Sequence, residues 1–151
     1  MGPPVSTWEC TVKPGTKIFV AASAVECSTF EENGTTEQEL RECAQKALKV
    51  QDQQLGVPTV EVDRKSVPVT QVETPLLDID LPADNILGPT VPAGQGLSVG
   101  AGWVALLHPL TPGSHPIVIV LDPDDPDKPT STITTTIVVS PALSLSVRRR
   151  R

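Results

Sequence analysis

The chain has 151 residues and a formal net charge of −6, with no Tyr and only two Phe and two Trp. This length suits one domain whose core of Val, Ile, Leu and Ala needs no structural metal. Without the four arginines at residues 148–151, 8 basic residues stand against 18 acidic ones, a net charge of −10. So acidic a body argues against nucleic acid as the main partner. No segment reaches the roughly 18 to 20 apolar residues that span a bilayer, so we expect no membrane span.

The sequence divides into a short leader, one domain and a basic tail. Residues 1–9 contain Gly2, Pro3 and Pro4, which discourage regular structure, and we expect this segment to be flexible. The domain is expected over residues 10–147. The arginine tail at residues 148–151 is either solvated or contacts an anionic partner or an acidic face of another copy.

The first predicted element of the domain is a strand at residues 17–25, between two turns. The preceding turn contains Pro14 and Gly15, and the following one contains Asn33 and Gly34.

A helix is predicted near residues 36–54. Thr36 and Glu39 form a Thr-x-x-Glu capping box, in which each side chain satisfies a free backbone amide. Gly56 and Pro58 end the helix. The residues that follow the cap at helical spacing form one face: Leu40, Cys43, Ala44, Ala47, Leu48 and Gln51.

After the helix the hydrophobic period changes from 3.6 to 2, which is typical of strands. Pro112 and Gly113 form a turn between two strongly apolar runs. About seven strands with frequent turns predict a mainly β fold, an antiparallel β-sandwich of Ig-like or jelly-roll-like type with the one helix alongside. The strands after the helix are expected at residues 60–62, 67–72, 77–81, 97–107, 117–121 and 131–140.

The three cysteines allow one disulfide and one leftover thiol. Cys43 lies on the inner face of the predicted helix, so we expect it to pair with Cys27 across the intervening loop. Cys10 is then the free thiol. Two separate buried thiols at Cys27 and Cys43 remain the alternative. A disulfide favours an oxidising location, extracellular or at the cell surface.

The densest acidic cluster is the candidate metal site, because carboxylate oxygens suit calcium. It lacks the glycine and the closing glutamate of an EF-hand loop, and a solvated loop between two strands is the alternative. No cofactor other than calcium is considered. The candidate ligands are Asp122, Asp124, Asp125 and Asp127.

A second set of carboxylates is the candidate for acid–base catalysis. Glu26, Glu31 and Glu32 would have to meet Asp78 and Asp80. Nothing in the sequence brings the two groups together. We therefore assign no catalytic residue and favour a non-catalytic protein.

Several short motifs are spread over residues 10–120. They are CTVKPGTKIF at residues 10–19, VECS at 25–28, GTTE at 34–37, LR at 40–41, CA at 43–44, LPADN at 81–85, Trp103, and PLTPGSH at 109–115. Together they resemble a group of uncharacterised secreted proteins of bacteria and archaea with a β-sandwich-like fold.

This resemblance implies export and adds no catalytic residue. Members of the group carry a further amino-terminal segment with another cysteine, and its lack here would leave Cys10 unpaired and an edge strand unprotected. Pro116 falls where the group continues straight into a strand. Because proline cannot donate to a strand ladder, we expect this strand to begin later or to lie at an edge.

The leading functional hypothesis is a secreted, non-catalytic β-sandwich that works by binding or by self-assembly. An exposed edge strand would recruit another copy of the chain, because its unpaired backbone groups accept a further strand. The alternatives are an extracellular hydrolase that uses clustered carboxylates and a calcium-stabilised adhesion module.

Overall fold

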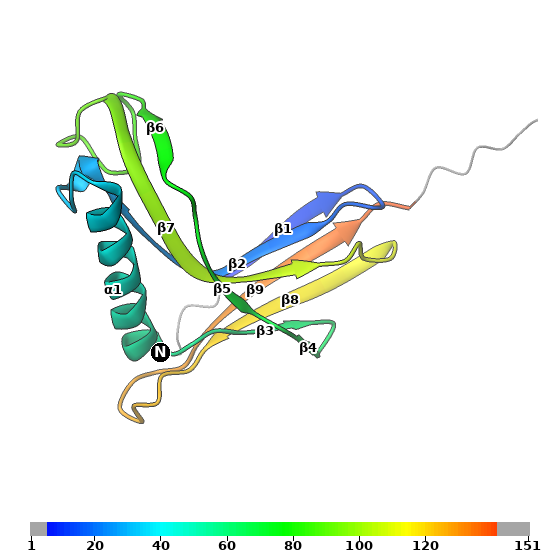
Figure 1. Ribbon diagram of the computed structural model, residues 1–151. Helices are drawn as coiled ribbons and strands as arrows, with labels where there is room; N and C mark the ends of the chain where they lie inside the picture. The colour runs from blue at the N-terminus through cyan, green and yellow to red at the C-terminus, as the bar shows by residue number, and fades with distance from the viewer. Residues whose placement is uncertain (1–5, 142–151) are drawn as a thin grey trace, which may run out of the picture.

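The computed structural model describes residues 6–141, in which nine strands and one α-helix form a mainly β protein (Figure 1). The strands are β1 (Ser6–Val12), β2 (Ile18–Ser28), β3 (Thr59–Val62), β4 (Lys65–Val67), β5 (Thr70–Glu73), β6 (Leu77–Leu81), β7 (Gly94–Leu107), β8 (Gly113–Leu121) and β9 (Ser131–Val139). The helix α1 spans Glu37–Leu55, and a short 3-10 turn, η1, spans Thr29–Glu31.

The strands form two sheets. The first sheet has the order β1-β9-β8-β3-β4, and its pairs are antiparallel apart from the parallel β1–β9 pair. The second sheet has the order β2-β7-β5 and is antiparallel, with β6 also paired to β7. The predicted mainly β, sandwich-like fold with one helix is therefore confirmed. Its finer assignment as Ig-like or jelly-roll-like stays a prediction.

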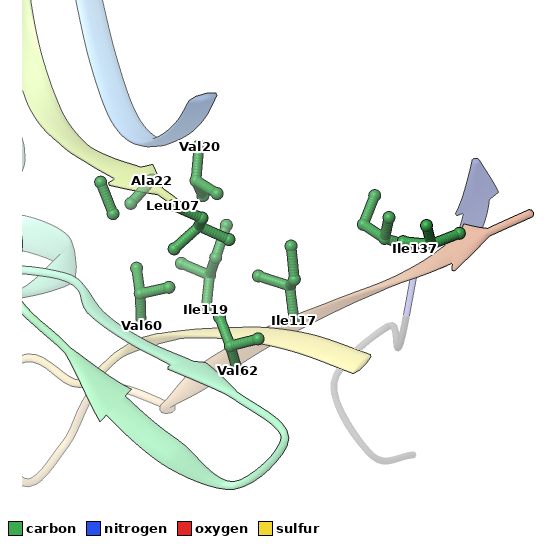
Figure 2. Close-up of a cluster of buried hydrophobic side chains, with 10 residues drawn as sticks. Val20, Ala22, Val60, Val62, Leu107, Ile117, Ile119 and Ile137 are labelled. Atoms are coloured by element: carbon green, nitrogen blue, oxygen red, sulfur yellow. The ribbon is translucent and has the colours of Figure 1, made fainter. Parts of the chain in front are cut away.

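Strand β7 is long enough for one of its faces to meet two different layers. Every second residue of β7 points to this face, and most of these residues are buried, from Val99 at one end to Leu107 at the other. Ile119 and other aliphatic residues of the first sheet pack at the Leu107 end (Figure 2). Leu40 and Leu48 of α1 pack at the Val99 end. The same face thus carries both hydrophobic clusters, one under each layer.

Strand β2 runs beside β7 and contributes to both clusters because of a bulge. Its register shifts between Ala21 and Ser23. Val20 packs against the first sheet, and Cys27 packs against α1. These two residues are seven positions apart, so in a regular strand they would face opposite sides. The extra residue at the bulge turns both inward.

Helix α1 follows the prediction closely. Thr36 is its N-cap and forms the full capping box with Glu39. The buried positions Leu40, Ala44 and Leu48 recur at helical spacing and face the second sheet. Gly56 ends the helix, and its N–H donates to the carbonyl of Asp52.

Two expectations about strand boundaries are wrong. Residues 6–9, expected to be flexible, are part of β1, whose parallel partner β9 lies far away in the sequence. Strand β8 begins at Gly113, before Pro116, and lies between β3 and β9. Pairing with β3 ends at Ile117, and the Pro116 carbonyl then accepts from Asp63 of the β3–β4 turn. Proline is tolerated here because its missing N–H lies just beyond that ladder.

Candidate interaction surface

Within residues 6–141, no layer packs on the outer face of the second sheet, which is largely apolar. Phe19 of β2 and Leu106 of β7 are directly paired, and they are 64% and 68% exposed. The cross-strand pairs place the other members of this surface on the same side. We call this surface the apolar face; it consists of Phe19, Ala21, Ala24, Val72, Val104 and Leu106.

A shallow groove of about 170 Å³ runs over this face, and no charged residue lines it. Gly100 and Gly102 of β7 form part of its floor. A Cβ at Gly102 would lie 2.3 Å from the carbonyl oxygen of Ser23 at the bulge, so only glycine fits there. The groove is therefore a consequence of the same bulge that lets β2 serve both cores.

Strand β2 is also the edge of its sheet, because it pairs with β7 and with no other strand of the described chain. At the end of β2, Asn33 makes two hydrogen bonds with Ser28. The Ser28 N–H donates to Oδ1 of Asn33, and the Asn33 N–H donates to the Ser28 carbonyl. Because part of the apolar face lies on β2, this face extends to the free edge of the sheet.

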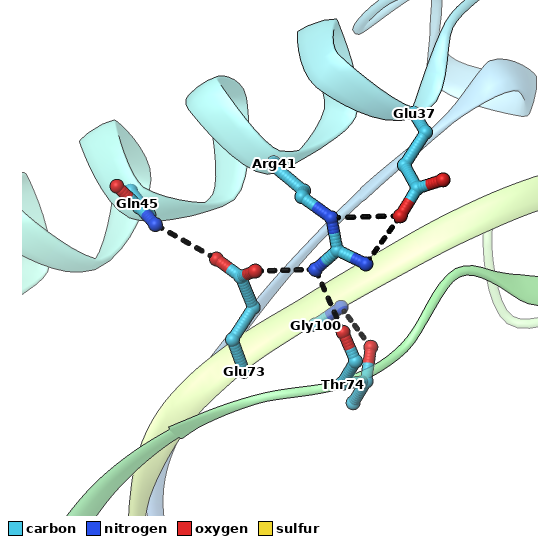
Figure 3. A network of polar contacts seen from close by, with 6 residues as sticks. All are labelled: Glu37, Arg41, Gln45, Glu73, Thr74 and Gly100. Atoms are coloured by element: carbon cyan, nitrogen blue, oxygen red, sulfur yellow. Dashed lines mark hydrogen bonds and ion pairs between the residues drawn. The ribbon is translucent and has the colours of Figure 1, made fainter.

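A polar network ties the helix to β5, which forms the other side of the apolar face. The Arg41 guanidinium donates to Glu37, to Glu73 and, at 3.0 Å, to the carbonyl of Thr74 (Figure 3). Gln45 donates to the second oxygen of Glu73 at 2.9 Å. These bonds, first from Gln45 and then from Arg41, hold the pKa of Glu73 below its usual value.

The predicted disulfide is present. Cys27 on β2 and Cys43 on α1 are joined, across a sequence separation of 16 residues. Cys10 is free and exposed on β1, which is the edge strand of the first sheet. Trp8 of the same strand is also exposed. Cys10 is thus the free thiol beside the Cys27–Cys43 disulfide.

The proposed calcium ligands do not converge. Asp122 accepts a hydrogen bond from Thr130, and Asp125 accepts from the backbone N–H of Asp127 and pairs with Lys128 at 3.8 Å. In residues 6–141, no group of three or more His, Cys, Asp or Glu side chains is arranged to hold a metal. Two of the four carboxylates, those of Asp122 and Asp125, thus bond to neighbouring groups of the loop, and the calcium site stays a prediction.

The candidate catalytic carboxylates are only partly brought together. Burial, followed by a hydrogen bond with Glu26, raises the pKa of Glu31. Glu26 also accepts from the Ser98 hydroxyl at 2.6 Å. Asp78 pairs with Leu97 in the ladder, so Asp78 and Asp80 lie on the opposite face of the sheet from Glu26 and Ser98. The five carboxylates do not share a site.

A histidine contact was missed by the sequence analysis. His115 is 9% exposed, its Nδ1 lies 2.7 Å from Oδ2 of Asp63, and its Nε2 lies 2.7 Å from the carbonyl oxygen of Thr111. A carbonyl and a carboxylate only accept, so these two contacts fit the protonated imidazole, in which both ring nitrogens donate. The bond to Asp63, followed by the bond to Thr111, raises the pKa of His115. Asp63 is 52 residues away in the chain, and no local pattern announces the contact.

No helix in the described part of the chain is long and apolar enough to cross a membrane. The arginine tail at residues 148–151 and residues 1–5 lie outside the described residues.

Comparison with known proteins gives no family. No family model matches the chain, and no curated protein matches it. Among solved structures, the chain is similar to the solution structure of amebosin, at 13% identity, over 91% of this chain and 99% of that chain. The TM-score is 0.26, and a likeness this distant carries no argument about this protein. The resemblance to secreted proteins of bacteria and archaea therefore stays a prediction.

Proposed function

We propose that the protein is a secreted, non-catalytic module that binds a second copy of itself through the apolar face. The observation that carries this proposal is the pair of Phe19 and Leu106, two large apolar side chains that are neighbours and are each about two-thirds exposed. Contiguous exposed apolar surface of this kind marks interaction sites in soluble proteins.

The lack of charged residues in the groove of the apolar face suits a second copy as the partner. The chain has a net charge of −6, so two copies repel each other in most orientations. The groove in the apolar face is lined without any charged residue. Contact between two apolar faces would bury no charge, and a twofold arrangement makes such a face self-complementary.

The free edge of β2 offers a second way for two copies to associate. Phe19, Ala21 and Ala24 belong to this edge strand. Antiparallel pairing of β2 with the β2 of a second copy would satisfy the unpaired backbone groups and join the two apolar faces into one surface. The bulge at residues 21–23 limits the length of regular pairing along this edge, so we favour direct contact between the two apolar faces.

The Cys27–Cys43 disulfide supports the extracellular part of the proposal, because such bonds persist in oxidising compartments.

Light scattering coupled to size exclusion, over a range of protein concentrations, tests the proposed association. The wild-type chain is expected to run as a dimer, and Leu106→Asp as a monomer with an unchanged circular dichroism spectrum. Ile86→Asp is the matched control, because Ile86 is 99% exposed in the loop before β7 and its variant should remain dimeric. A monomeric wild-type chain at every concentration, or a dimeric Leu106→Asp, would refute the proposal.

A further inference from the structure

A cleft of about 500 Å³ opens between the two sheets at the end of the molecule that holds the β3–β4 hairpin. One wall is this hairpin, and the other is the end of β7 with the loop that follows it. The volume is in the range of small-molecule sites. Its apolar lining comes from both walls: Val62, Val67, Pro68, Leu107, Pro109 and Leu110.

The two walls are tied together by one side chain. His115 donates to Asp63 at the tip of the hairpin and to the carbonyl of Thr111 in the opposite loop, both at 2.7 Å. Asp63 itself lines the cleft. These two contacts link the walls on either side of the cleft.

One charged side chain at the cleft has no partner. The carboxylate of Asp63 lies 2.7 Å from Nδ1 of His115. Lys65 is paired with Val62 in the ladder, so its side chain leaves β4 on the face toward the core, and it lines the cleft. Within residues 6–141, Lys65 makes no salt bridge. Lys65 is exposed, so its ammonium group lies at the mouth of the cleft without a carboxylate partner.

We propose that this cleft binds a small amphipathic carboxylate, with its apolar chain between the sheets and its carboxylate on Nζ of Lys65. A cationic ligand would meet Lys65 as a like charge, and the Asp63 carboxylate is already in contact with His115. An uncharged ligand would gain the apolar contacts and leave the ammonium group unpaired. An inward lysine on an edge strand also hinders pairing with other strands, and that role needs no ligand.

Isothermal titration with octanoate, octan-1-ol and octylammonium at neutral pH distinguishes these roles. Octanoate is expected to bind at one saturable site, octan-1-ol more weakly, and octylammonium most weakly. Lys65→Met should weaken octanoate binding by about tenfold, in keeping with the loss of a charge-assisted hydrogen bond. Lys46→Met, on the exposed side of α1, is the matched control and should bind as the wild type does.

Amide NMR spectra place the ligand. Octanoate should shift the signals of Val67 and Leu110 and leave that of Val72 on the apolar face unchanged. Absence of saturable octanoate binding, equal affinity for the three head groups, unchanged affinity in Lys65→Met, or shifts confined to Val72 would each overturn the proposal. Leu106 belongs to the apolar face and also lines the cleft, so it is left unchanged in these variants.

Discussion

Gly56, at the end of helix α1, lies directly against the main chain of Asp122, which follows β8. A Cβ built on Gly56 would be 2.2 Å from the carbonyl oxygen of Asp122 and 2.5 Å from its carbonyl carbon. Gly56 also has a φ of 85°, in the region that favours glycine. The end of helix α1 and the end of strand β8 in the first sheet therefore contact each other through their backbones at Gly56.

The close contact makes Gly56→Ala strongly destabilising. The methyl group can be accommodated only if the helix end and the strand end separate, in addition to the cost of the positive φ. We expect the free energy of unfolding to fall by more than about 2 kcal/mol, measured by denaturant titration.

Gly88→Ala separates the two contributions. Gly88 has a φ of 97°, and nothing lies within 4 Å of a Cβ built on it. This control should cost about 1 kcal/mol, from the backbone alone. Equal losses in the two variants would show that the contact with Asp122 does not matter.

The disulfide joins the helix to the edge strand that carries the apolar face. Replacing both Cys27 and Cys43 by Ala should lower the free energy of unfolding by about 3 kcal/mol, because a loop of this length is then free in the unfolded chain. Cys10→Ala is the control and should cost little, since Cys10 is exposed.

Alkylation followed by intact mass measurement checks the pairing in the same samples. Without reductant the wild-type chain should take one alkyl group, at Cys10, and after reduction and unfolding it should take three. Three groups without reductant would contradict the disulfide.

The features that could be predicted from the sequence are those with a local signal. The capping box of Thr36 and Glu39 marks the helix start, and helical spacing places Cys43 on the face that meets Cys27. In contrast, residues 18–25 are apolar at almost every position, so alternation could not show which face of β2 would be left uncovered. The apolar face follows from which layers pack on β7, and this is set by tertiary contacts.

Contacts between distant residues account for the other differences. Strand β1 is held by a parallel pairing with β9, and its own sequence carries only a weak strand pattern. The acidic loop at residues 122–127 has the composition of a cation site, but composition does not show that these carboxylates bond within the loop. The bulge in β2 likewise appears only when the strand must match both cores.

The stability that Glu39 contributes as part of the helix cap depends on pH. The N–H groups of Thr35 and Thr36 donate to Glu39 at 2.8 and 3.0 Å, and these bonds lower the pKa of Glu39. A lowered pKa in the folded state stabilises the protein above the unfolded pKa, and this stability is lost as the pH falls through the folded pKa. Thermal unfolding between pH 3 and 7 should therefore show a smaller pH effect for Glu39→Gln than for the wild type. Glu42→Gln, on the exposed surface of the same helix, should behave as the wild type.

The contact of His115 with Asp63 predicts the opposite pH dependence. Because the folded state raises the pKa of His115, its protonated form stabilises the protein fully below the unfolded value of about 6.5, and this contribution is lost as the pH rises through the folded pKa. The wild-type chain should lose stability as the pH rises above about 6.5, and His115→Gln should be less stable than the wild type below this pH and flatter above it. His108 remains in both proteins, so the difference between their unfolding free energies isolates His115. A difference that stays constant with pH would mean that His115 is neutral in the folded chain and that one of its two contacts is not formed.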